Sequence, residues 1–112
     1  GVPFILKFLE THNAKAAFFV AGFIGLLGIK DLDKINNDIA YRKFDWNKIT
    51  CNCKSFHIFH SDNDPYVPLN KAEELAKNLN TKPTIIPNAG HFNEKAGYTK
   101  FQLLLDDINA CI

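Results

Sequence analysis

The chain has 112 residues, of which 46% are hydrophobic and 22% are charged, and this length gives one domain that can bury a core of its own. The 13 Lys and Arg residues balance the 12 Asp and Glu residues, so the composition excludes an intrinsically disordered chain and a strongly basic nucleic-acid-binding protein. We therefore expect a single domain over residues 1–112, with no nucleic acid among its partners.

The first segments predict a helix and a buried strand. Residues 2–10 place a proline in the first turn of a helix and apolar side chains on nearly every face of it, so this helix needs covering elements on several sides. Residues 16–21 form a short apolar run that stops at Gly22, the pattern of a parallel strand covered on both faces. The uncharged run 16–29 is shorter than the roughly 20 residues of a membrane-spanning helix. We expect no membrane partner.

The rest of the chain alternates between strands and helices. Residues 23–50 are interpreted as a loop with one or two short helices. Strands are expected at 55–61 and 84–86, and apolar residues at three- and four-residue spacing predict helices at about 69–79 and 98–112. This order is typical of a parallel α/β sheet, in which helices make the crossover connections.

The cysteines indicate a reducing environment. Cys51, Cys53 and Cys111 are odd in number, and no secretory signal precedes them. This pattern favours reduced thiols over a disulfide framework and predicts a cytoplasmic protein.

Metal sites are disfavoured by spacing. The Cys51-x-Cys53 pair has no second pair or suitably spaced histidine to complete a zinc site. Residues 62–64 begin like a calcium loop but lack its glycine and its terminal glutamate. His57 and His60 lie three apart on a strand and point to opposite faces, which suits a core or strand-end role. We expect no bound metal.

Two turns carry the candidate chemistry. Functional groups of an open parallel sheet gather past the carboxyl ends of its strands. Asp62 and Asp64 follow the strand at 55–61, and His91 follows the next strand. A carboxylate beside an imidazole fixes its tautomer and prepares it to act as a general base. The alternative is that these are ordinary solvated loop residues.

A family resemblance favours the catalytic interpretation. Asp64-Pro65-Tyr66-Val67-Pro68 and Asn88-Ala89-Gly90-His91-Phe92 resemble the acid and histidine segments of α/β-hydrolases. The stretch 60–108 is similar to the C-terminal part of the small serine hydrolases of the retinoblastoma-binding protein 9 and YdeN group. Phe44-Asp45-Trp46 resembles the short segment before the acid-bearing strand of these proteins.

The resemblance implies a fold and an activity. The fold would be the C-terminal part of an α/β-hydrolase, with about three parallel strands and flanking helices. The activity would be hydrolysis of a small-molecule ester or amide without a metal or organic cofactor. Asp64 would be the catalytic acid and His91 the catalytic base, with Asp62 as the second candidate for the acid.

The nucleophile of that family is missing from these residues. Ser55 and Ser61 lack the flanking glycines of a nucleophile elbow and are expected to be strand and turn hydroxyls. The opening Gly1-Val2-Pro3-Phe4 resembles the end of a Gly-x-Ser-x-Gly elbow and its helix, so we expect the serine two residues before Gly1. The absence of methionine agrees with an upstream segment. We expect this chain alone to be inactive, and its exposed sheet edge to meet the missing N-terminal half or another copy.

Substrate contacts and a competing function complete the expectations. Phe23, Ile24 and Phe92 are the candidate substrate-binding residues, with Leu26 and Leu27 in the same loop, and core packing is the alternative role for the loop residues. The competing function is a non-catalytic binding or protein-interaction module on a hydrolase-like scaffold. A nucleotide-binding domain ranks last because no glycine-rich phosphate loop follows a strand.

Overall fold

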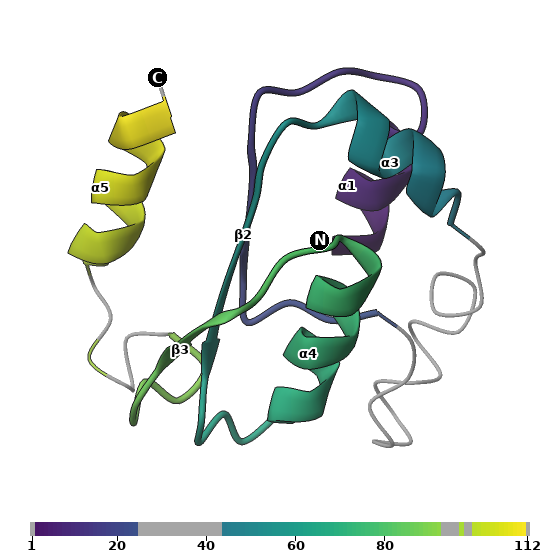
Figure 1. Cartoon of the computed structure of the whole chain (residues 1–112). Helices are drawn as coiled ribbons and strands as arrows, with labels where there is room; N and C mark the ends of the chain where they lie inside the picture. The colour runs from purple at the N-terminus through teal and green to yellow at the C-terminus, as the bar shows by residue number, and fades with distance from the viewer. Residues whose placement is uncertain (1, 25–43, 93–96, 98–99, 112) are drawn as a thin grey trace.

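The computed structural model describes residues 2–24, 44–92, 97 and 100–111. In chain order, its elements are α1 (Val2–Leu9), β1 (Ala17–Val20), α3 (Trp46–Asn52), β2 (Phe56–Ser61), α4 (Leu69–Asn78), β3 (Thr84–Ile86) and α5 (Gln102–Cys111) (Figure 1). The predicted strands and helices are all present, and α3 is one of the short helices expected before residue 50. Residues 25–43 of that loop, including Leu26 and Leu27, lie outside the described residues.

The strands form one parallel sheet in the order β1-β2-β3. Phe18 pairs with His57, and Phe59 pairs with Thr84. Parallel neighbours need a crossover connection, and α4 supplies the one between β2 and β3. Within the described residues β1 has a strand on one side only. The predicted α/β architecture of about three parallel strands with flanking helices is confirmed.

The helices cover the two faces of the sheet unequally. Figure 1 shows α1, α3 and α4 on one side of the sheet and α5 on the other. The main core lies on the first side and includes Val2, Leu6, Leu9, Phe19, Ile49, Ile58 and Leu75. On the second side the rings of Phe59 and Phe101 meet edge to face, with centroids 5.5 Å apart. None of the residues of α5 is fully buried, so this face is the more open one.

The first turn of α1 lies where the strands end. A methyl group added to Gly22, just past β1, would overlap Cγ2 of Val2. The start of α1 therefore shares the carboxyl edge of the sheet with the turns that follow β2 and β3. Its apolar circumference is only half covered, because Leu6 is buried while Phe4 and Phe8 are 58% and 51% exposed. This confirms that α1 needs more cover than the described residues give it.

The last helix differs from its prediction in two respects. It begins at Gln102, because the carbonyl of Phe101 accepts the first helical N–H bond, from Leu105. Leu105 is one of the apolar residues whose three- and four-residue spacing predicts this helix, but it is 49% exposed. Leu104 and Ile108 lie four apart on one helix face and are half-buried. Leu105 lies one position further round, so a single stripe of contact leaves it outside.

The three cysteines are all free, Cys51 exposed, Cys53 buried and Cys111 half-buried. No helix in the described part of the chain is both long enough and apolar enough to cross a bilayer. The cytoplasmic location stays a prediction.

Candidate active site

Asp64 is fixed by the turn that it begins. Its Oδ1 accepts the backbone N–H groups of Tyr66 and Val67, at 2.8 and 2.9 Å. An aspartate that binds N–H groups two and three residues ahead closes a local turn, and Pro65 presets the backbone angle within it. The side chain of Asp64 is 0% exposed. The carboxylate therefore has one orientation, with Oδ2 left for a partner outside the turn.

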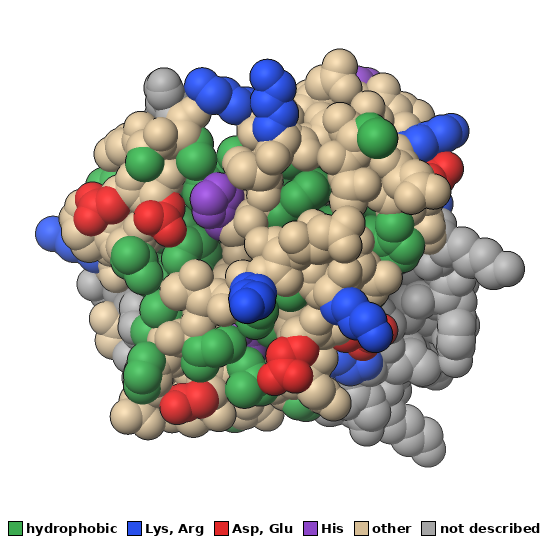
Figure 2. All heavy atoms as spheres, viewed as in Figure 1, with side chains coloured by type: hydrophobic (Ala, Val, Ile, Leu, Met, Phe, Trp, Pro, Cys, Tyr) green, Lys and Arg blue, Asp and Glu red, His purple; other side chains and the backbone are tan. Residues whose placement is uncertain are grey.

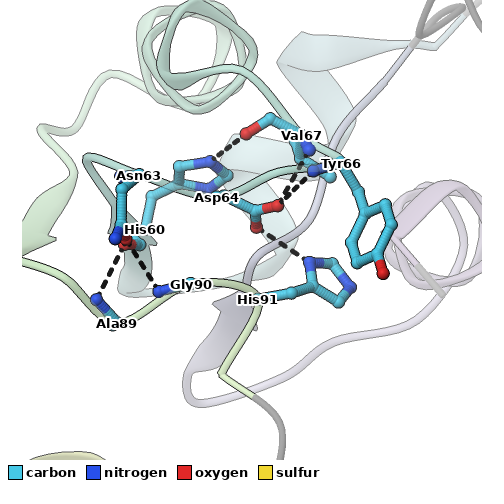
Figure 3. A network of polar contacts seen from close by, with 9 residues as sticks. His60, Asn63, Asp64, Tyr66, Val67, Ala89, Gly90 and His91 are labelled. Carbon is cyan, nitrogen blue, oxygen red and sulfur yellow. Dashed lines mark hydrogen bonds and ion pairs between the residues drawn. The ribbon is translucent and has the colours of Figure 1, made fainter. Parts of the chain in front are cut away.

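That partner is His91. Its Nδ1 lies 2.8 Å from Oδ2 of Asp64 (Figure 3). An ionised carboxylate can only accept, so Nδ1 carries the hydrogen and the neutral ring keeps a lone pair on Nε2. The ring of Tyr66 meets the imidazole edge to face at 5.3 Å. The His91 side chain is 37% exposed, and Nε2 has no hydrogen-bond partner among the described residues. The pair thus presents a free, oriented basic nitrogen.

The turn that carries His91 is bound to the turn that carries Asp64. Three consecutive side chains at the end of β2, here called the loop clamp (Ser61, Asp62 and Asn63), accept three consecutive backbone N–H groups after β3. The bonds run from Asn88 to Asp62 Oδ1 (2.9 Å), from Ala89 to Ser61 Oγ (3.0 Å) and from Gly90 to Asn63 Oδ1 (2.8 Å). Two of them are drawn in Figure 3. Together they fix the spacing of the turns next to the Asp64–His91 contact.

The loop clamp was not predicted from the sequence. Ser61 is 0% exposed and also donates to Asn63 Oδ1 at 2.6 Å, so the expected turn hydroxyl has a specific structural role. Oδ1 of Asp62 accepts the backbone N–H of Asn88. The geometry therefore pairs Asp64, not Asp62, with the histidine. The sequence feature that could have indicated it was three short polar side chains at the end of a strand, a composition typical of side-chain bonds to neighbouring backbone.

His60 supports the acid turn from the core. It is fully buried, and its Nε2 lies 2.8 Å from the carbonyl oxygen of Val67. Val67 in turn donates its N–H to Asp64. Nδ1 of His60 is buried without a partner in the described part of the chain. The predicted core role of His60 is confirmed, whereas His57 lies on the other face, stacked on Phe18 with centroids 4.6 Å apart.

The comparisons with known proteins identify the family of the chain. A family model described as serine hydrolase matches residues 1–109. The chain belongs to the serine hydrolase family. It is 30% identical over 92 residues to the serine hydrolase RBBP9 of Rattus norvegicus, covering 82% of this chain and 48% of that protein. It is 28% identical over 111 residues to the putative hydrolase YdeN of Bacillus subtilis, covering 95% of this chain and 56% of that protein.

A solved structure of this serine hydrolase family shares the fold. The crystal structure of the ydeN gene product from B. subtilis superposes with a TM-score of 0.85 at 25% sequence identity, over 97% of this chain and 59% of that one. The chain thus spans about half the length of the relatives it matches. The expected group is confirmed.

The predicted substrate-binding residues have different environments. Ile24 is 7% exposed and packs in the core, which is the alternative role left open for it. Phe23 is half-buried. Phe92 is half-buried and stacks on Phe101 with centroids 5.1 Å apart. That Phe23, Ile24 and Phe92 contact the substrate stays a prediction.

The backbone around His91 has an unusual conformation. Asn88, Gly90 and Phe92 have φ angles of 54°, 57° and 52°. Asn and Gly tolerate this left-handed region, but for Phe it costs about 1–2 kcal/mol. The N–H of Phe92 binds the carbonyl of Ala89 at 3.0 Å, and the stacking on Phe101 holds the ring. Phe92 therefore stabilises the turn that presents His91.

Proposed function

We propose that the protein from which this chain comes is a serine hydrolase acting on small-molecule esters or amides, with Asp64 as the acid and His91 as the base. One observation carries the proposal: His91 Nδ1 is held 2.8 Å from a buried carboxylate while the opposite edge of the ring is open. Family membership supports it. No metal and no organic cofactor takes part in the proposed chemistry.

The proposed nucleophile is a serine two residues before Gly1, outside this chain. The position of α1 supports this, because Val2 lies against Gly22 at the carboxyl edge of the sheet, the edge that also carries Asp64 and His91. A serine just before this helix would reach the same edge. The backbone N–H of the residue after it would point at a developing oxyanion.

In this mechanism, His91 acts through Nε2. The nitrogen takes the serine proton as the oxygen attacks the carbonyl carbon, and Asp64 stabilises the imidazolium that forms. The same nitrogen returns the proton to the leaving group. Water, activated by the same base, then releases the acyl group and regenerates the serine. The present chain holds the acid and the base only, and we expect it to be inactive by itself.

The remainder of the protein is the proposed partner of the open surfaces. On one side, β1 has no strand neighbour among the described residues, and such an edge offers backbone groups that other strands bind readily. The exposed rings of Phe4 and Phe8 lie on the adjacent helix. We expect the chain alone to self-associate through these surfaces and the longer protein to remain monomeric, as gel filtration over a range of concentrations will measure.

The test uses the longer protein and a fluorophosphonate probe, which reacts with activated serines. We expect wild type to be labelled and the 112-residue chain to remain unlabelled. Asp64→Asn is expected to lower kcat for p-nitrophenyl ester hydrolysis by about 10⁴-fold, because the amide favours the wrong tautomer of His91. Asp62→Asn is the matched control: its amide oxygen still accepts the N–H of Asn88, and activity should stay within a few-fold.

Three results would contradict the proposal. Equal activity of the Asp64→Asn and Asp62→Asn variants would show that the buried carboxylate does not serve a base. Labelling of Ser55 or Ser61 in the 112-residue chain would place the nucleophile inside it. An unlabelled longer protein, folded but without esterase activity, would favour the non-catalytic binding module.

A further inference from the structure

A second group of reactive side chains lies at the opposite edge of the sheet. Cys111 Sγ, at the end of α5, lies 3.6 Å from Nε2 of His57, and the same nitrogen lies 3.3 Å from Oγ of Ser55. Ser55 directly precedes β2, and His57 is its second residue. This group is thus at the start of the strand whose end leads to Asp64, and it takes no part in the proposed hydrolysis.

A pocket opens beside the thiol. It has a volume of about 340 Å³ and is lined by Lys15, Lys54, Ser55, Ala110 and Cys111. Among the described residues that line it, the charged side chains are the two lysines. In Figure 2 a hollow separates α5, at the left, from the body of the molecule, with Lys or Arg side chains along its upper edge. The pocket has room for a small molecule and favours a negatively charged one.

We propose that Cys111 is a site of thiol–disulfide exchange with small anionic disulfides, with His57 as the proton acceptor and Lys15 and Lys54 as the anion-binding groups. A nucleophilic sulfur within reach of an imidazole nitrogen is the arrangement that activates cysteine in enzymes. Here a cationic pocket adjoins it.

The hydrogen bonds suit the ion pair that this reaction needs. With its hydrogen on Nδ1, the neutral ring of His57 offers Nε2 to the thiol proton. After transfer, the Nε2–H lies between the thiolate and Ser55 Oγ, whose own hydrogen points to the carbonyl of Lys15 at 3.5 Å. The ring of Phe18, stacked on His57, stabilises the imidazolium through its π-face.

The reaction balances without a further reagent. The Cys111 thiolate attacks one sulfur of the incoming disulfide, a new S–S bond forms to Cys111, and the old S–S bond breaks. The second sulfur leaves as a thiolate and takes the proton from His57. The last carbonyls of α5 carry partial negative charge, which favours the imidazolium and opposes the thiolate. The lysines are therefore essential to the proposal, since they offset this opposition.

The experiment compares two cysteines of the same chain. Cys51→Ala leaves Cys111 as the accessible thiol, and Cys111→Ala leaves Cys51, which is exposed. Cys53 is buried and must stay unmodified in both variants, which reports that each is folded. Stopped-flow absorbance measures the reaction with dianionic 5,5′-dithiobis(2-nitrobenzoate) and with neutral 4,4′-dithiodipyridine, and mass spectrometry locates the mixed disulfide.

We expect Cys111 to react with the dianionic disulfide about tenfold faster than Cys51 at low salt. Lys15→Ala with Lys54→Ala should remove this advantage for the dianion while leaving the rate with the neutral disulfide within about twofold. His57→Phe, which keeps a ring on Phe18, should slow both reactions of Cys111. Equal rates for Cys111 and Cys51, or a lysine effect of the same size on both disulfides, would overturn the proposal.

Discussion

The side-chain oxygen of Asn63 accepts the backbone N–H of Gly90 at 2.8 Å, one residue before His91. The same oxygen accepts the hydroxyl of Ser61 at 2.6 Å. Asn63→Ala removes both acceptor contacts, and we expect the free energy of unfolding of the chain to fall by about 1–2 kcal/mol. Urea denaturation followed by tryptophan fluorescence measures it.

The matched control for Asn63 is Asn70, an exposed asparagine of α4. Asn70→Ala places a better helix former on a helix surface, so its stability should be unchanged or slightly raised. Equal destabilisation by the two substitutions would show that the contact with Gly90 contributes nothing specific.

The two serines of the chain allow a test of the loop clamp. Ser61→Ala leaves the buried N–H of Ala89 without its acceptor, and we expect a loss of about 1–3 kcal/mol. Ser55→Ala removes two long contacts, to the carbonyl of Lys15 and to Nε2 of His57, at a partly exposed position and should cost less than about 0.5 kcal/mol. Chemical denaturation of both variants gives the comparison, and a Ser61→Ala cost as small as that of Ser55→Ala would contradict this account of the clamp.

The close approach of Gly22 and Val2 predicts a coupled pair. A methyl group at Gly22 overlaps Cγ2 of Val2, so Gly22→Ala should destabilise the chain by about 1–3 kcal/mol through overpacking. In the background of Val2→Ala that cost should largely vanish, because the smaller side chain makes room. A double-mutant cycle measures the coupling, and strictly additive effects would show that the strain is relieved elsewhere.

Cys53 predicts an alkaline loss of stability. Burial raises the pKa of this thiol above its ordinary value of 9.0, an effect only partly opposed by a hydrogen bond with the backbone of Ser55. The folded state therefore keeps the proton where the unfolded state has lost it. This contribution is complete below about pH 9 and is lost as the pH rises through the folded pKa.

The measurement is urea unfolding between pH 7.5 and 10.5 for wild type and Cys53→Ala. The stability advantage of wild type should shrink as the pH rises, because the variant lacks the buried thiol. Cys51→Ala is the control: it removes an exposed thiol, and its stability should follow wild type at every pH. A constant difference between wild type and Cys53→Ala would refute the prediction.

The local pattern of apolar residues was enough to predict the elements whose own apolar residues are buried. The residues of β2 and α4 show their structure through a short apolar run and through helical spacing, since the second half of β2 is buried on both faces and α4 buries one face. The prediction for the last helix was less accurate, because Leu105 is exposed. How wide a stripe is covered depends on what packs against it, and the residues of a helix do not contain that information.

The candidate site likewise has a part that the sequence predicts and a part that it does not predict. Asp64 and His91 could be selected because their turns follow successive strands of a parallel sheet, so that topology alone brings them to one edge. The loop clamp could not be predicted. Which backbone N–H each short polar side chain binds depends on how the two turns are positioned relative to each other. That position is set by the packing of the residues beneath the turns.

By itself, the sequence determined the parallel α/β order, the family resemblance and the identity of the candidate acid and histidine, because these follow from periodicity and from residues close together in the chain. Only the tertiary structure decided that Ser61, Asp62 and Asn63 hold the histidine turn, and that Cys111 lies beside His57, 54 positions earlier. Such contacts arise when separate elements settle on a common core. Which residues become partners depends on their distance in space, and their spacing along the chain places almost no constraint on that distance.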